Sequence, residues 1–260
     1  MKNFKKAIAL LLAAVLLVAA SVMGTIAYLT DVDKDINVMS AGNVEIVQNE
    51  TNRDGTAYTN TKTLLPAVYN NLTLDTVPEK AETMPNPAGG ANLAIWGDEV
   101  QNVIDKVITV TNSGSENAYV RTILLVENTA DNAILDKVHF NFNDVGQTMV
   151  NEGMVTIEST SYTIFVRTYT DALEADKVSA PSLMQVYLDP SVDNAWYENL
   201  GTDGKFSIIA FSQATQKQGF GDAVIALNAA FGGVTPETVS NWMLDTKYTI
   251  KTDDLANVIS

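Results

Sequence analysis

The sequence predicts an all-β protein, a jelly-roll-like β-sandwich with one or two short helices inserted near the C-terminus. Segments rich in β-branched and aliphatic residues recur along the chain, and short polar stretches with Gly, Ser and Asn separate them. Helical spacing of apolar residues is confined to one region, after residue 220. Many strands with a single helical region favour a sandwich over a fold that alternates strands and helices.

The N-terminus is typical of a secretory signal. A lysine-rich start leads into an apolar run from Ala7 to Ala20, and a small-residue site follows it. We predict cleavage between Ala27 and Tyr28, with Thr25, Ala27 and Tyr28 as the signal-peptidase site. The alternative is a retained membrane anchor, since the apolar run extends to residue 23, at the short limit of what spans a bilayer. The predicted organisation is a signal peptide at 1–27, an N-terminal segment at 28–42 and a jelly-roll domain at 43–260.

The composition narrows the function classes. The net charge is −15 at pH 7, and the chain after Ala27 has no cluster of Lys and Arg, so we expect no nucleic acid among the partners. No second apolar run of comparable length follows the leader, so we expect no stable membrane anchor after cleavage. The chain has no cysteine and one histidine, His139, which excludes thiol catalysis, Cys-type zinc sites and multi-His metal sites. We therefore expect a non-enzymatic protein with no cofactor, no metal and no catalytic residues.

Eight segments carry the strongest strand patterns. They are Asn43–Asn49, Val103–Asn112, Ala118–Glu127, Lys137–Phe142, Met154–Glu158, Tyr162–Tyr169, Leu183–Leu188 and Phe206–Phe211. The loop between the second and third holds Ser113-Gly114-Ser115, which predicts either a hairpin or a sheet corner. Short strands are expected at Leu64–Tyr69 and Leu72–Leu74, and Asp171–Pro181 is predicted to be a loop.

Near the C-terminus the spacing of apolar residues changes from a strand pattern to a helical one. Apolar residues within Gly221–Phe231 follow helical spacing, with Asp222 as the predicted N-cap and Gly232-Gly233 at the end. A second helix is predicted to begin at Thr235-Pro236, with Thr as the N-cap, and to reach about Leu244. A last strand is expected at Lys247–Lys251.

Three parts of the chain resemble the TasA/camelysin (CalY) family. The stretch Gly24-Thr25-Ile26-Ala27-Tyr28-Leu29-Thr30-Asp31, followed by Ser40-Ala41-Gly42-Asn43-Val44, is similar to the family's signal region. A block that runs from Asp105 through Asn112 and Gly114 to Ala118-Tyr119-Val120-Arg121 is similar to its D-K-x-x-x-V-x-N-x-G…A-Y-V-R element. The stretch from Gln213 to Phe220 is similar to its Q-A-x-Q-A-x-G-F element, with Lys217 departing from the usual Ala.

The resemblance implies a jelly-roll protein that a Gram-positive bacterium secretes as a fibre or matrix protein of a biofilm. It also implies processing by a SipW-type signal peptidase, a homo-oligomeric fibre and an accessory matrix protein as a further partner. In such a fibre the freed N-terminal segment of one subunit inserts as a strand into the next. The candidate donor segment is 28–39. Its assembly residues are Tyr28, Leu29, Val32, Ile36 and Val38.

Two alternatives belong to other functional classes. The first is a camelysin-like surface metalloendopeptidase, an activity that the resemblance implies. A single histidine leaves only carboxylates as further metal ligands, and these suit Ca²⁺ or Mg²⁺ better than catalytic Zn²⁺. A secreted adhesin or glycan-binding module is the other, with Trp96, Trp196 and Trp242 as a candidate platform, although such residues in a sandwich usually pack in the core. The run Asp31-x-Asp33-x-Asp35 begins like a calcium loop, but it lacks the glycine and the glutamate that the loop requires.

Overall fold

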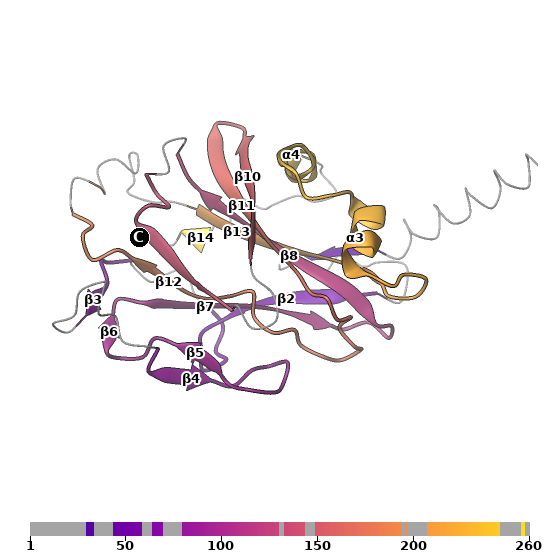
Figure 1. The fold of residues 1–260 in the computed structure, drawn as a ribbon, viewed down its shortest axis with the longest axis horizontal. Coiled ribbons are helices and arrows are strands. Elements are labelled where there is room, and N and C mark those ends of the chain that lie inside the picture. The colour runs from indigo at the N-terminus through magenta and orange to yellow at the C-terminus, as the bar shows by residue number, and fades with distance from the viewer. Residues whose placement is uncertain are drawn as a thin grey trace, which may run out of the picture.

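The chain folds into two antiparallel sheets that pack face to face, with two short helices near the C-terminus (Figure 1). The computed structural model describes residues 30–33, 44–58, 64–69, 80–129, 133–143, 149–193, 196, 207–244 and 256–257. This arrangement confirms the predicted fold class, an all-β sandwich.

The first sheet, sheet A, has the strand order β1-β13-β8-β11-β10, and β14 also pairs with β13. Its strands are β1 (Thr30–Asp33), β8 (Ala118–Glu127), β10 (Val150–Ile157), β11 (Thr160–Thr168), β13 (Ser207–Gln216) and β14 (Ala256–Asn257). The second sheet, sheet B, has the order β2-β7-β12-β9. Its strands are β2 (Ile46–Thr51), β7 (Ile104–Asn112), β9 (Val138–Phe142) and β12 (Leu183–Leu188).

The main core lies between the sheets. Sheet A contributes Leu124, Val126 and Ile208, and sheet B contributes Ile104, Ile108, Leu183, Val186 and Leu188. A short polar chain crosses the same interface toward one end. There Ser212 of β13 donates to Oε1 of Gln48 of β2 at 2.8 Å, and its Oγ lies 3.2 Å from Oγ1 of Thr122 of β8. These hydrogen bonds fix the two sheets relative to each other, because buried hydroxyls and amides need specific partners.

Both outer faces of the sandwich are also covered. Helices α3 (Ala223–Phe231) and α4 (Pro236–Leu244) lie over sheet A (Figure 1). Val239 and Trp242 of α4 pack on the apolar side chains of this sheet. On the other side β4 (Glu82–Met84) and β5 (Leu93–Ile95) pack on sheet B. The pair β3 (Val68–Tyr69) and β6 (Val100–Gln101) adds a further small layer. Strands β7 and β8 are buried on both faces, which explains why apolar residues occupy both faces of each, although each also carries buried charged residues such as Lys106 and Arg121.

The loop after β7 is a sheet corner, because β7 belongs to sheet B and β8 to sheet A. The hairpin alternative is therefore wrong. The predicted helix ends are confirmed: Asp222 Oδ1 accepts a hydrogen bond from the Ile225 N–H, Gly232 has a positive φ of 88°, and Pro236 opens α4. The predicted strands Leu72–Leu74 and Lys247–Lys251 lie outside the described residues.

Several strand bounds and one helix face differ from the prediction; for example, β2 begins at Ile46 instead of Asn43, and β10 begins at Val150 instead of Met154. The strand expected to end at Phe211 continues to Gln216, because its polar second half is buried between β8 and β1. On α3 the buried side chains are Ala223, Ala226 and Leu227, whereas Val224, which shares the helical spacing, is 51% exposed. The helix rests on its small residues, which allow a close approach to sheet A.

Candidate functional site

The edge of sheet A at β13 is where the N-terminal segment meets the sandwich. Strand β1 pairs antiparallel with the second half of β13, with Thr30 opposite Thr215 and Asp33 opposite Ser212. Strand β14 pairs with the first two residues of β13. Among the described residues, Ile209–Phe211 have no strand partner on this side. The edge is thus covered in two short pieces contributed by sequence positions near opposite ends of the chain.

The candidate donor residues are only partly within the described chain. Val32 lies in β1, opposite Gln213. Thr25, Ala27, Tyr28, Leu29, Ile36 and Val38 lie outside the described residues, so the cleavage site and most of the donor segment remain predictions. Asp31 and Asp33 belong to the strand β1 and thus to extended backbone.

Parts of the stretches that carry the family resemblance lie next to each other at this edge, whereas the Asp105–Asn112 part lies on β7 of sheet B. The Ala118–Arg121 block lies on β8, and Gln213 begins the other block on β13. These strands are direct neighbours, with Arg121 opposite Gln213 and Ala118 opposite Gln216. Since β1 pairs with the other side of β13, Thr30 and Asp31, the described end of the N-terminal stretch, lie on the third of three adjacent strands.

Arg121 joins this edge to the helices that cover it. Its side chain is buried, and it donates from Nε to Gln213 Oε1 at 2.7 Å, from Nη1 to Asn228 Oδ1 at 3.1 Å and from Nη2 to the Gly232 carbonyl at 2.9 Å. The guanidinium also lies 5.3 Å from the centre of the Trp242 ring. Burial lowers the pKa of Arg121 to about 10. Its hydrogen-bond acceptors are thus neutral carbonyl and amide oxygens.

Asn112 organises the corner between the two sheets. Its side chain is fully buried and donates from Nδ2 to the carbonyls of Glu116 at 2.8 Å and Leu173 at 2.9 Å. Its Oδ1 accepts a hydrogen bond from the Gly114 N–H at 3.0 Å. These three bonds close the loop that follows β7, which is the physical role of the asparagine in the Asn-Ser-Gly stretch.

A lysine is buried inside the sandwich. The side chain of Lys106, on β7, is 0% exposed and forms an ion pair with Glu50 of the adjacent strand β2. Its Nζ also lies 4.4 Å from the centre of the Tyr58 ring. Burial and the nearby charge of Glu50 raise the pKa of Tyr58 to about 12. Sequence reasoning did not identify this cluster, because a lysine in an apolar strand resembles an exposed edge residue.

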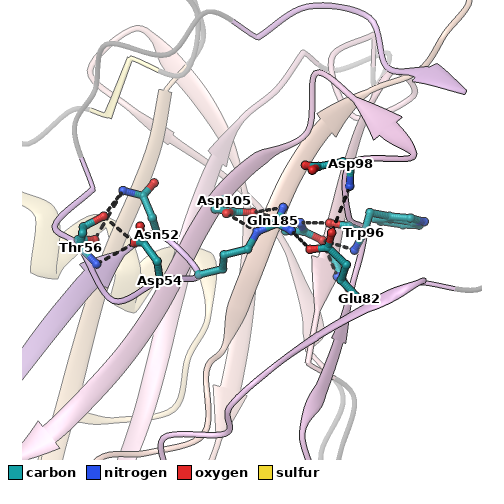
Figure 2. A network of polar contacts seen from close by, with 10 residues as sticks. Asn52, Asp54, Thr56, Glu82, Trp96, Asp98, Asp105 and Gln185 are labelled. Carbon is teal, nitrogen blue, oxygen red and sulfur yellow. Dashed lines mark hydrogen bonds and ion pairs between the residues drawn. The ribbon is translucent and has the colours of Figure 1, made fainter.

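A polar network holds the outer layer on sheet B (Figure 2). Arg53 binds Asp105 with two hydrogen bonds, at 2.6 and 2.9 Å, and Glu82 with a third at 2.6 Å. The side-chain amide of Gln185 accepts from the Trp96 N–H at 2.9 Å and donates to the Trp96 carbonyl at 3.0 Å. Gln185 thus serves as a strand partner for the end of β5, and the network attaches β4 and β5 to sheet B.

Position 97 requires a glycine, because a Cβ at this position would overlap the Glu82 side chain. We expect Gly97→Ala to lower the free energy of unfolding by about 1 kcal/mol, since Glu82 would leave its partly exposed pair with Arg53. Denaturant unfolding measures this change. Gly221→Ala, at a position with open space, should change little. If Gly97→Ala lowers the free energy of unfolding by the same amount when Glu82 is already replaced by alanine, the explanation is wrong.

The three tryptophans and the histidine singled out in the sequence make packing and hydrogen-bond contacts within the fold. Trp242 packs on sheet A, Trp196 packs against the main core, and Trp96 lies edge-on to the Tyr187 ring with centroids 4.6 Å apart. His139 Nε2 lies 3.4 Å from Asp189 Oδ2. Within the described ranges, no three Asp, Glu or His side chains are grouped closely enough to hold a metal ion. The described helices are all too short or too polar to cross a membrane.

A cavity of about 440 Å³ lies along the connection from β11 to β12. Its lining includes Arg167, which donates to the carbonyls of Asn143 and Pro181. Ser179 is also part of the lining, and its hydroxyl donates to the Tyr169 hydroxyl at 3.4 Å. These bonds tie the connection to the strands beside it, so the polar groups of the cavity have structural roles.

Comparison with known protein families, characterised proteins and solved structures finds no match to this chain. The functional argument therefore depends on the site itself, and above all on the β13 edge.

Proposed function

We propose that this chain is an exported structural protein of the extracellular matrix, biofilm or cell surface that assembles head-to-tail into fibres. In the fibre, the N-terminal segment of each subunit adds as a strand to β13 of the next. The observation that carries the proposal is the pairing of β1 with the edge strand β13. The same backbone hydrogen bonds form whether β1 comes from its own subunit or from a neighbour, which is the basis of strand exchange.

The energetics of the sheet edge support this assembly. Without β1, residues Ser212–Thr215 would present unpaired N–H and C=O groups at the edge of sheet A. An added strand satisfies these groups through its main chain, and its alternating side chains fix the register. Because the donor and acceptor surfaces differ, each added subunit leaves a new acceptor free. Assembly of this kind extends without closing and produces a filament.

The predicted cleavage after Ala27 fits this scheme. A segment held at the membrane by an uncleaved leader is not free to insert into another subunit. Removal of the leader by a SipW-type signal peptidase would release the donor segment outside the cell. The absence of cysteine is consistent with an exported protein that gains stability from assembly instead of disulfides.

Electron microscopy of the purified 28–260 chain tests the proposal. We expect filaments, and we expect Val32→Pro to prevent them, because proline cannot donate a backbone hydrogen bond and fits poorly within a sheet. Val32→Thr is the matched control and should assemble, since it keeps the backbone N–H and the β-branched shape. Deletion of residues 28–39 should also leave a folded protein without filaments. A wild-type chain that stays monomeric at all concentrations and salt conditions contradicts the proposal.

A further inference from the structure

Two buried hydrogen-bond donors lie side by side at the β13 edge without enough acceptors. Arg121 is 2% exposed, and none of the carboxylates whose side chains the structure describes (those of Asp31 and Asp33 are not among them) lies within ion-pair distance of it. Gln213 is 0% exposed, and its Nε2 makes no hydrogen bond within the described chain. The two side chains are joined, since Arg121 Nε donates to Gln213 Oε1. A buried charge and a buried amide both cost free energy unless a partner compensates them.

The neighbours of Arg121 leave its charge uncompensated. Its acceptors are the neutral oxygens of Gln213, Asn228 and Gly232, together with the ring faces of Phe231 and Trp242. A guanidinium has more N–H donors than these bonds use. Burial also lowers the pKa of this group to about 10, which reflects the cost of keeping it charged here. The site thus has spare donors and positive charge, which is the complement of a carboxylate.

The strand β1 pairs with β13 directly at Gln213. Val32 lies opposite Gln213, and Asp31 and Asp33 lie on either side of Val32, opposite Ala214 and Ser212. In a β-strand, residues that oppose each other share one face of the sheet. A shift of one residue in register therefore brings an aspartate opposite Gln213. The strand that pairs with β13 therefore has a carboxylate residue one position to either side of the residue opposite Gln213.

We propose that Arg121 and Gln213 form a carboxylate-binding site, and that its ligand is Asp31 or Asp33 of the strand that a second copy of the chain adds to β13. The inference rests on the proposed function and adds a recognition rule to it. In the register of β1, a valine lies opposite Gln213. An incoming strand shifted by one residue gains a charge-assisted hydrogen bond, which is roughly twice as strong as a neutral one. The acidic character of the donor segment then favours exchange between subunits.

A labelled peptide of residues 28–39, added to the mature 28–260 chain, tests the site without requiring fibres. We expect either Asp31→Asn or Asp33→Asn in the peptide to weaken binding about tenfold, as loss of one charged hydrogen bond implies. Asp136→Asn in the protein is the matched control: this aspartate is exposed, so binding should not change. If both substituted peptides bind as tightly as the wild-type peptide, the inference is wrong.

Gln213→Glu provides the second test, because it places a carboxylate on Arg121 within the subunit. We expect this variant to unfold at a higher temperature and to bind the wild-type and Asp→Asn peptides equally. A solvent anion is the competing explanation. If acetate raises the unfolding temperature of the wild type but not of Gln213→Glu, and the peptides bind alike, the site serves a free anion and the inference fails.

The two proposals fail in different ways. Aspartate-dependent peptide binding without filaments of the wild-type chain would refute the fibre function and leave the carboxylate site standing. Filaments that form equally well from chains with both aspartates replaced would leave the fibre function standing and refute the site.

Discussion

Replacement of Glu50 by glutamine is expected to lower the free energy of unfolding by about 3 kcal/mol, because it leaves the buried ammonium of Lys106 without a counter-charge. Lys106 is 0% exposed and its ion-pair partner is Glu50, whose side chain is 24% exposed. The ring of Tyr58 offers a second but weaker electrostatic contact. Chemical denaturation of the 28–260 chain measures the change.

The opposite substitution provides the matched control for this pair. Lys106→Met removes the buried charge and fills its space with an apolar side chain of similar length, so we expect a loss of less than about 1 kcal/mol. Glu50 tolerates this change because part of its carboxylate reaches water. The double variant should recover most of the stability that Glu50→Gln alone loses. Equal losses in the two single variants would show that the charge of Lys106 is not what Glu50 compensates.

Asn112→Asp is expected to cost about 3 kcal/mol of unfolding free energy, since it removes two buried donors at once. The carbonyls of Glu116 and Leu173 would lose their partner and face a carboxylate oxygen instead. Only the bond from the Gly114 N–H would remain. Because this corner joins β7 to β8, we expect hydrogen exchange to increase first in residues 113–117.

Asn49 provides a control on the neighbouring strand β2. Its Nδ2 donates to Thr111 Oγ1 at 2.9 Å, but the side chain is only partly buried, so water replaces the lost bond. Asn49→Asp should cost less than about 1 kcal/mol. A similar cost for both asparagine variants would contradict the role assigned to the corner.

The sequence predicted the existence of the long strands better than their partners. β7 and β8 were recognisable because most of their residues are apolar or β-branched. Both faces of these strands are buried, so the pattern hides which face meets which layer, and the choice between a hairpin and a corner stayed open. The strands β4 and β5 were missed, since three residues each are too few for a pattern and the stretch between them is rich in Pro, Asn and Gly.

The site was predictable where it depends on local sequence and unpredictable where it depends on distant contacts. The caps of α3 and α4 follow from local hydrogen bonding, and the predictions for them are confirmed. Gln213 lies beyond Phe211, where the strand was predicted to end, and it is buried beside Arg121 of β8, which is 92 residues away in sequence. The same holds for Lys106, whose partner Glu50 lies 56 residues away in sequence.

Disulfide trapping between two single-cysteine chains tests the central claim most directly, since the natural chain has no cysteine. Thr30 and Thr215 are opposite each other in the β1–β13 register, at a separation that a disulfide can span. A mixture of Thr30→Cys chains and Thr215→Cys chains, oxidised under assembly conditions, should yield a covalent dimer of one chain of each kind, enriched in the filament fraction. No such dimer in the mixture, together with an intrachain disulfide in the double-cysteine variant, would show that β1 stays on its own subunit.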